Sequence, residues 1–158
     1  MNKYSKEFMD EAIRLAADNV HSGNGGPFGA VVVRNGEIIA RGVNMVTALN
    51  DPTAHAEVVA IRKACEFLGW FEIKDCELYS SCEPCPMCLG AIYWSRPRAI
   101  YFAASREDAA KSGFDDAHIY EEICSPLKER QILTQHIAHE NSLKAFEKWK
   151  ESGNKIPY

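Results

Sequence analysis

The chain has 158 residues, of which 46% are hydrophobic and 25% charged, and its formal net charge at pH 7 is −4. This length fits one domain, and the composition is that of a globular protein rather than a disordered or fibrous one. No apolar run reaches the ~18 residues of a membrane span, and the N-terminal residues lack the apolar stretch of a secretory signal. We therefore expect a cytoplasmic protein with no membrane partner. The acidic balance also makes a nucleic-acid partner unlikely, because such proteins usually carry a basic surface.

The first half of the chain predicts a helix, a β-hairpin and a second helix. Apolar residues recur at helical spacing in the first twenty residues, and a glycine-rich loop ends that segment. The dipeptide Asn35-Gly36 favours the positive φ angles of a type I′ turn and so joins two apolar runs into a hairpin. Gly69 is a typical stop for the helix before it. The expected elements are a helix at 4–20, strands at 30–34 and 37–43, a loop at 44–54 and a helix at 55–68.

Shorter elements alternate in the second half. Pro84 falls near the first turn of a predicted helix, where its missing N–H leaves no hydrogen bond unmade. This alternation after an opening hairpin indicates a single α/β domain over residues 1–158, a three-layer α/β/α sandwich with a mixed sheet in the middle. The expected elements are a strand at 76–80, a helix at 84–94, a strand at 98–103, an irregular or short-helical segment at 105–125, a strand at 132–138 and a helix at 143–149.

Two short runs, His55-Ala56-Glu57 and Cys85-Pro86-Met87-Cys88, indicate a metal site. Cys85 and Cys88 are three residues apart, so on a helix they share a face, and near a helix N-terminus the dipole favours their thiolates. In a cytoplasmic chain, cysteines are better interpreted as metal ligands or buried thiols than as disulfides. His55 adds an imidazole at the start of another helix, and two sulfurs with one nitrogen suit zinc. We predict one zinc ion held by His55, Cys85 and Cys88.

Three protein ligands leave one tetrahedral position for water, which distinguishes a catalytic zinc site from a structural one. Zinc lowers the pKa of bound water from about 15.7 to about 7. Glu57 is two residues past His55, where it could take a proton from that water and pass it to a substrate. Its alternative interpretation is a solvated residue in a first helical turn. Cys82, three residues before Cys85, would close the site as a fourth ligand, but Glu83-Pro84 favours an extended turn that points it away.

Together these runs match the signature H-x-E…P-C-x-x-C of the zinc nucleobase deaminases. The resemblance covers nearly the whole chain and extends to Asn44, the run at 51–57 and the step Gly90-Ala91. It implies the cytidine deaminase-like fold, a five-stranded mixed sheet flanked by helices, with one zinc ion per subunit.

Within this superfamily the chain is most similar to the bacterial guanine deaminases. The features that carry this similarity are the runs 25–29, 91–94 and 113–116 and an aromatic last residue, Tyr158, without an arginine-rich terminal helix. The resemblance implies hydrolysis of guanine to xanthine and ammonia in purine catabolism or salvage. It implies Glu57 and Asp116 as catalytic residues, and a homodimer that exchanges a C-terminal segment from about residue 139. The substrate-binding residues that it implies are Phe28, Asn44, Ala56, Trp94 and Tyr158.

Simpler interpretations stand beside these roles. Phe28 and Trp94 could be core aromatics, Asn44 a turn residue, Asp115 and Asp116 a helix cap, and Tyr158 a frayed end. The competing enzymatic function is deamination of adenosine in tRNA, with cytosine, adenine or a pteridine-like ring as further substrates. A competing function of another class is a zinc-stabilised binding module without catalysis, with four protein ligands that include Cys82.

Overall fold

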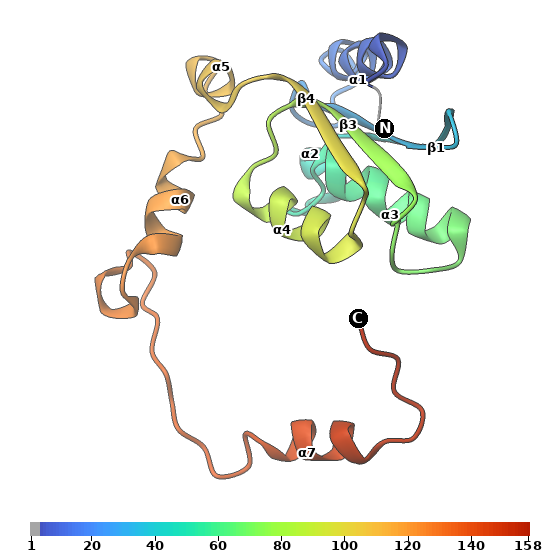
Figure 1. Cartoon of the computed structure of the whole chain (residues 1–158). Helices are drawn as coiled ribbons and strands as arrows, with labels where there is room; N and C mark the ends of the chain where they lie inside the picture. Colours follow the sequence, from blue (N-terminus) through green and yellow to red (C-terminus); the bar gives the residue numbers. More distant parts are fainter. Residues whose placement is uncertain (1–3) are drawn as a thin grey trace. The chain divides into compact units, whose positions relative to one another are not determined.

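The computed structural model describes residues 4–158 and divides into two compact units, of which the first ends at Ala117 and the second runs from His118 to Tyr158 (Figure 1). The prediction of a single domain over the whole chain therefore stays a prediction. The elements of the first unit are α1 (Lys6–Asn19), β1 (Gly29–Arg34), β2 (Glu37–Val43), α2 (Val46–Leu49), α3 (Ala56–Leu68), β3 (Cys76–Cys82), α4 (Pro86–Ser95), β4 (Ala99–Ala104) and α5 (Arg106–Lys111).

One mixed sheet of four strands forms the centre of the first unit, in the order β2-β1-β3-β4. Strand β1 is antiparallel to β2 and to β3, whereas β3 runs parallel to β4, with α4 as the connection. The turn of the β1–β2 hairpin has positive φ angles at Asn35 (53°) and Gly36 (81°), as the dipeptide predicts. The α/β class and the mixed sheet are thus confirmed.

Helices cover both faces of this sheet, which gives the three layers. Alternate residues of β1 are buried on opposite faces: Val31 and Val33 pack with α1, whereas Ala30 and Val32 pack with α3. The side of α3 also carries Leu78 of β3, and α4 lies on this same side (Figure 1). A strand buried on both faces is expected to be apolar throughout, and the Ala-Val-Val-Val run of β1 is.

The prediction of a fifth strand at 132–138 is wrong: no strand is present between residues 105 and 158. A strand needs a neighbour to bond its backbone groups, and residues 132–138 pair with no other strand. Its apolar side chains are exposed, Ile132 at 80%, Leu133 at 81% and Ile137 at 74%. An alternating pattern alone therefore predicted a strand whose partner the chain does not supply here.

The second unit consists of short helices and extended chain. Helix α6 (Ala117–Cys124) begins at the last residue of the first unit, and the 3-10 helix η1 (Leu127–Glu129) and α7 (Lys144–Glu151) follow. The predicted helix at 143–149 corresponds to α7, which begins one residue later and extends two residues further. No helix within residues 4–158 is long and apolar enough to cross a membrane.

Candidate metal centre and active site

The two predicted ligand runs each lie where a helix begins. His55 has an extended conformation (φ −71°, ψ 157°) and is the N-cap of α3, and Cys85 is the N-cap of α4 (φ −63°, ψ 168°). Pro86 occupies the first turn of α4, where it needs no backbone hydrogen bond. Cys88 follows within the same turn. Helices α3 and α4 pack against each other, so their N-termini bring these three side chains together.

The ligand atoms of His55, Cys85 and Cys88 all lie within 4.8 Å of one another. The Nδ1 atom of His55 is 3.6 Å from Cys85 Sγ and 3.5 Å from Cys88 Sγ. Tetrahedral zinc, with bonds of about 2.3 Å to sulfur and about 2.05 Å to nitrogen, would separate such atoms by about 3.6 Å. The three side chains therefore fit one zinc ion without rearrangement of the nitrogen–sulfur distances.

Protonation of the two cysteines is strongly coupled. A hydrogen bond from the Cys88 thiol and a further one from His55 lower the pKa of Cys85 to about 4, although burial opposes this. The same bond to Cys85, together with burial, raises the pKa of Cys88. The bond to Cys85 also raises the pKa of His55. A divalent cation would satisfy both sulfurs as thiolates, since coordination deprotonates a thiol outright.

Glu57 lies in the first turn of α3 and is 6% exposed, so the interpretation as a solvated helix residue is wrong. Its Oε2 accepts a hydrogen bond from Cys88 Sγ at 3.6 Å, and its Oε1 accepts one from Ser80 Oγ at 3.3 Å. Burial raises the pKa of this carboxyl group. A carboxylate beside a metal site, with a pKa above its ordinary value, is suited to proton transfer.

Cys82 stands outside the group that could hold a metal among the described residues. It ends β3, it is buried, and its Sγ donates to the carbonyl of Ser105 at 3.6 Å. Burial raises the pKa of the Cys82 thiol to about 11, so this thiol is protonated and can donate to that carbonyl. The closed, four-ligand site of a zinc-stabilised module is therefore not what these side chains form.

Asn44 follows β2 and is 5% exposed. Its Oδ1 accepts hydrogen bonds from the backbone N–H groups of Gly26 and Val46, each at 3.2 Å, so the interpretation as a turn residue holds. Asn19 Nδ2 donates to the Asn44 carbonyl at 3.0 Å and fixes the backbone there. Because the side-chain oxygen is already occupied by two donors, only the amide NH2 group remains to meet a substrate, as a donor.

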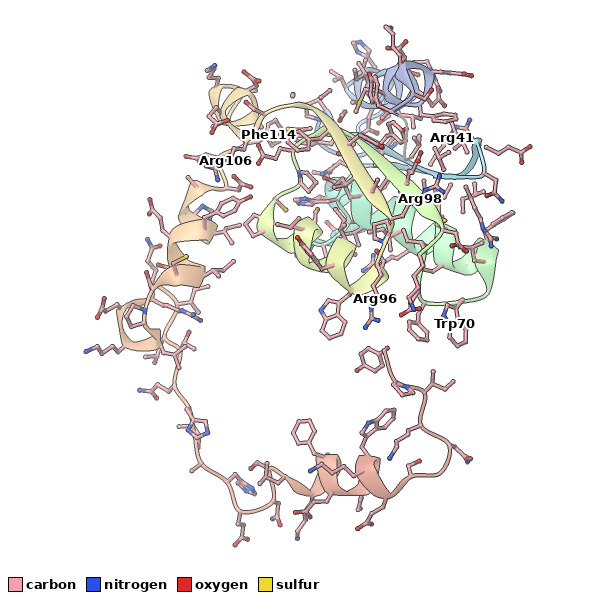
Figure 2. All side chains as sticks on the ribbon, viewed as in Figure 1. Arg41, Trp70, Arg96, Arg98, Arg106 and Phe114 are labelled. Carbon is pink, nitrogen blue, oxygen red and sulfur yellow. The ribbon has the colours of Figure 1, made fainter. Side chains whose placement is uncertain are left out.

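The two predicted substrate aromatics of the first unit have different surroundings. Phe28 is half-buried and packs edge-to-face against Phe114, with ring centroids 5.0 Å apart at 86°. Figure 2 labels Phe114. Trp94, late in α4, is 64% exposed, so it is not a core aromatic. Ala56, between His55 and Glu57, is fully buried.

Asp116 is half-buried near the end of the first unit. Burial raises its pKa, and the charge of Cys85 adds to that effect, so the carboxyl group lies within electrostatic reach of the ligand cluster. The capping interaction belongs to its neighbour, since Asp115 Oδ1 accepts from the N–H of Ala117 at 2.9 Å. Tyr158 ends the second unit and is 71% exposed.

Sequence reasoning missed Ser80 and the aromatic partner of Phe28. Ser80 has the polarity of a surface residue but lies at a buried position of β3, on the same face as Leu78. The sequence signal for Ser80 was its position two residues after Leu78, which places a polar residue on the buried face of the strand. Its contact with Glu57 joins residues 23 apart in the sequence, which spacing alone does not predict.

Comparisons with known proteins agree with this geometry. Residues 2–104 match the cytidine and deoxycytidylate deaminase zinc-binding region. A guanine deaminase of Bacillus subtilis is 55% identical over 151 residues, which cover 96% of this chain and 97% of that protein. The X-ray structure of guanine deaminase from Bacillus subtilis superposes with a TM-score of 0.96 at 53% identity and covers 99% of both chains. A tRNA-specific adenosine deaminase of Agrobacterium fabrum is 46% identical, but over only 55% of this chain and 59% of its own length.

Proposed function

Because this chain belongs to the family of the cytidine and deoxycytidylate deaminase zinc-binding region, we propose that it is a zinc-dependent guanine deaminase, which converts guanine and water into xanthine and ammonia. The observation that carries the proposal is a cluster of one imidazole and two sulfurs beside a buried carboxylate, in a chain similar to a guanine deaminase over nearly its full length. The tRNA-specific deaminases match a much smaller part of it.

His55, Cys85 and Cys88 would hold the zinc ion, one per subunit. When bound, zinc supplies the Lewis acidity that makes water nucleophilic at neutral pH. Glu57 then acts as the proton carrier. Its Oε2, on the side of Cys88, would accept one proton from the attacking water and deliver it to a ring nitrogen of the purine, and would then carry the second proton from the added hydroxyl to the amino group, which leaves as ammonia.

Recognition of the base would rest on complementary hydrogen bonds. Asn44, whose amide NH2 group remains to donate, suits the carbonyl or N7 acceptors of guanine. Asp116, as an acceptor that also assists proton transfer, suits the N–H donors that guanine presents. Phe28 and Trp94 offer aromatic faces to the flat base. The full burial of Ala56 favours a role in spacing His55 and Glu57 over contact through its side chain.

We also propose that the protein is a cytoplasmic homodimer acting in purine catabolism, in which the segment from about residue 139 is exchanged and Tyr158 closes a base pocket. The exposed apolar side chains of the second unit support this, because association would remove them from water. They include Ile132, Leu133, Ile137, Leu143, Phe146, Trp149, Ile156 and Tyr158. Light scattering of the purified chain should give twice the mass of one subunit, and a monomer would refute this part.

The deaminase itself is tested by ammonia release from a panel of free bases, nucleosides and a tRNA anticodon hairpin, with zinc present. We expect release from guanine far above the others. Glu57→Gln should keep zinc at one ion per subunit and lower kcat by a factor of about 10² or more, because the proton carrier is lost. Release from the hairpin but not from guanine would contradict the proposal, and normal turnover by Glu57→Gln would remove that residue from its role.

A further inference from the structure

A serine hydroxyl lies behind the proposed proton carrier. Ser80 is 2% exposed near the end of β3, and its Oγ donates to Glu57 Oε1 at 3.3 Å. In the sheet it pairs with Ala30 of β1 on one side and Phe102 of β4 on the other. The hydroxyl is therefore carried by a central strand that neighbours hold on both edges, which is a rigid position for a hydrogen-bond donor.

The two oxygens of Glu57 have different partners. Oε1 accepts from Ser80, on the side of the sheet, and Oε2 accepts from Cys88, on the side of the metal ligands. With Oε1 bonded to a fixed strand, rotation of the carboxylate would break that bond. The bond thus fixes the orientation of the carboxylate, with one oxygen on the strand and the other facing the ligands.

Burial of a hydroxyl at this position is unfavourable unless the hydroxyl is hydrogen-bonded, and its contact with Glu57 supplies that bond. The buried face of β3 that Ser80 continues is otherwise formed by the apolar side chains of Cys76 and Leu78. An unpaired hydroxyl there would be unfavourable, and Glu57 is the partner that the Ser80 side chain contacts. If residue 80 served only to pack the sheet against α3, alanine would be sufficient at this position.

We propose that Ser80 is a positioning residue, whose hydroxyl holds Oε1 of Glu57 so that Oε2 is the oxygen that carries the proton. This inference rests on the proposed deaminase function. Catalytic hydrogen bonds are often long in the free enzyme and tighten when substrate is bound, so the 3.3 Å contact is expected to shorten during turnover.

The test compares Ser80→Thr with Ser80→Val, because the two side chains have nearly the same shape and differ in the hydroxyl. Any strain from the added methyl group is common to both variants. We expect kcat for guanine to be at least about tenfold lower in Ser80→Val than in Ser80→Thr, with the same KM and zinc content, since a hydrogen bond to a charged group is lost. In the Glu57→Gln background the ratio should fall close to one.

Ser81→Ala is the matched control. Ser81 is the next residue of β3, it is also buried, and its Oγ accepts a hydrogen bond from the N–H of Gly29 at 3.1 Å rather than contacting Glu57. This variant should keep the kcat of the wild type. Equal kcat in Ser80→Thr and Ser80→Val, or a difference confined to KM or zinc content, would overturn the positioning role.

Crystal structures of the two Ser80 variants make the result independent of the proposed function. We expect the Glu57 carboxylate to keep its orientation in Ser80→Thr and to rotate or become disordered in Ser80→Val. The same well-ordered carboxylate in both would overturn the inference even if both were inactive. If the wild type released no ammonia from guanine, the proposed function would fail, while the carboxylate orientation would still decide the role of Ser80.

Discussion

Substitution of Gly42 by alanine should damage the metal centre, although Gly42 is not part of it. Gly42 lies on β2 where the strand meets α3, and a Cβ atom there would be 2.1 Å from the carbonyl oxygen of Ala56 and 2.6 Å from the N–H nitrogen of Ala60. Both of these are backbone atoms, so rotation of a side chain cannot relieve the contact. Ala56 is the residue between His55 and Glu57.

The expected magnitude follows from these distances. An ordinary contact of this kind is about 3.5 Å, so α3 must move away from β2 by about 1 Å. Overpacking of this kind costs about 1–3 kcal/mol of unfolding free energy. Misplacement of reacting groups by about 1 Å can lower a rate about 10²-fold. Because the displaced backbone carries a metal ligand and the proton carrier, we expect loss of stability, of zinc affinity and of turnover together.

Gly36→Ala is the control for Gly42→Ala. Gly36 has a φ of 81° in the hairpin turn, so alanine is strained there, but nothing lies within 4 Å of its added Cβ. It should cost about 1 kcal/mol of unfolding free energy without change in zinc content. Thermal unfolding, zinc titration against a chelator and ammonia release from guanine measure the three effects. A Gly42→Ala protein with wild-type zinc affinity and kcat would refute the argument that β2 sets the position of α3.

Three further predictions concern single side chains. Gly90→Ala should raise the unfolding free energy by about 0.5–1 kcal/mol in a denaturant titration, because Gly90 is inside α4 and its added Cβ meets nothing within 4 Å; a decrease would contradict this. Hydrogen bonds from Arg14 and Arg41 (Figure 2) lower the pKa of Glu11 to about 2, so its stabilisation is present above pH 4.5 and is lost as the pH falls through about 2. Glu11→Gln should therefore cost about 0.5–1 kcal/mol at pH 7 and nothing well below pH 2, since water screens these half-exposed partners; a cost that does not change with pH would contradict it. Asn44→Asp, which loses the amide donor, should lower kcat/KM for guanine about tenfold or more while zinc content stays the same, and an unchanged value would exclude the amide from recognition.

Local signals carried most of what the sequence predicted correctly. The Asn35-Gly36 turn and the glycine stop after α3 each act within a few residues, and both are present in the structure. The prediction that Pro84 lies in the first turn of the next helix is wrong, because α4 begins at Pro86 and Pro84 precedes its N-cap, Cys85. The cysteine pair of the metal cluster could also be predicted, because a helix start and a three-residue spacing determine where Cys85 and Cys88 lie relative to each other. Their distance to His55, 30 residues or more away in the chain, depends on how α3 and α4 pack, which spacing alone does not determine.

Long-range contacts account for the errors and the omissions. The segment 132–138 has a strand-like pattern but no partner strand among the described residues, and pairing is a property of the fold rather than of the segment. The contact of Ser80 with Glu57 and that of Phe28 with Phe114 each join different elements of the first unit. Both follow from the packing of α3 on β3 and of the 113–116 loop on the loop before β1, which periodicity does not encode.

The charges around the cluster favour a neutral base over a polyanionic substrate. With zinc bound, two thiolates balance the cation, and Glu57 and Asp116 add negative charge nearby. The N-termini of α3 and α4 converge on the cluster and stabilise the thiolates, but their partial charges do not outweigh two carboxylates. A phosphate group close to these carboxylates would be repelled, whereas a free purine offers N–H donors to them. The electrostatics of the site thus agree with a neutral base, such as guanine, as the substrate.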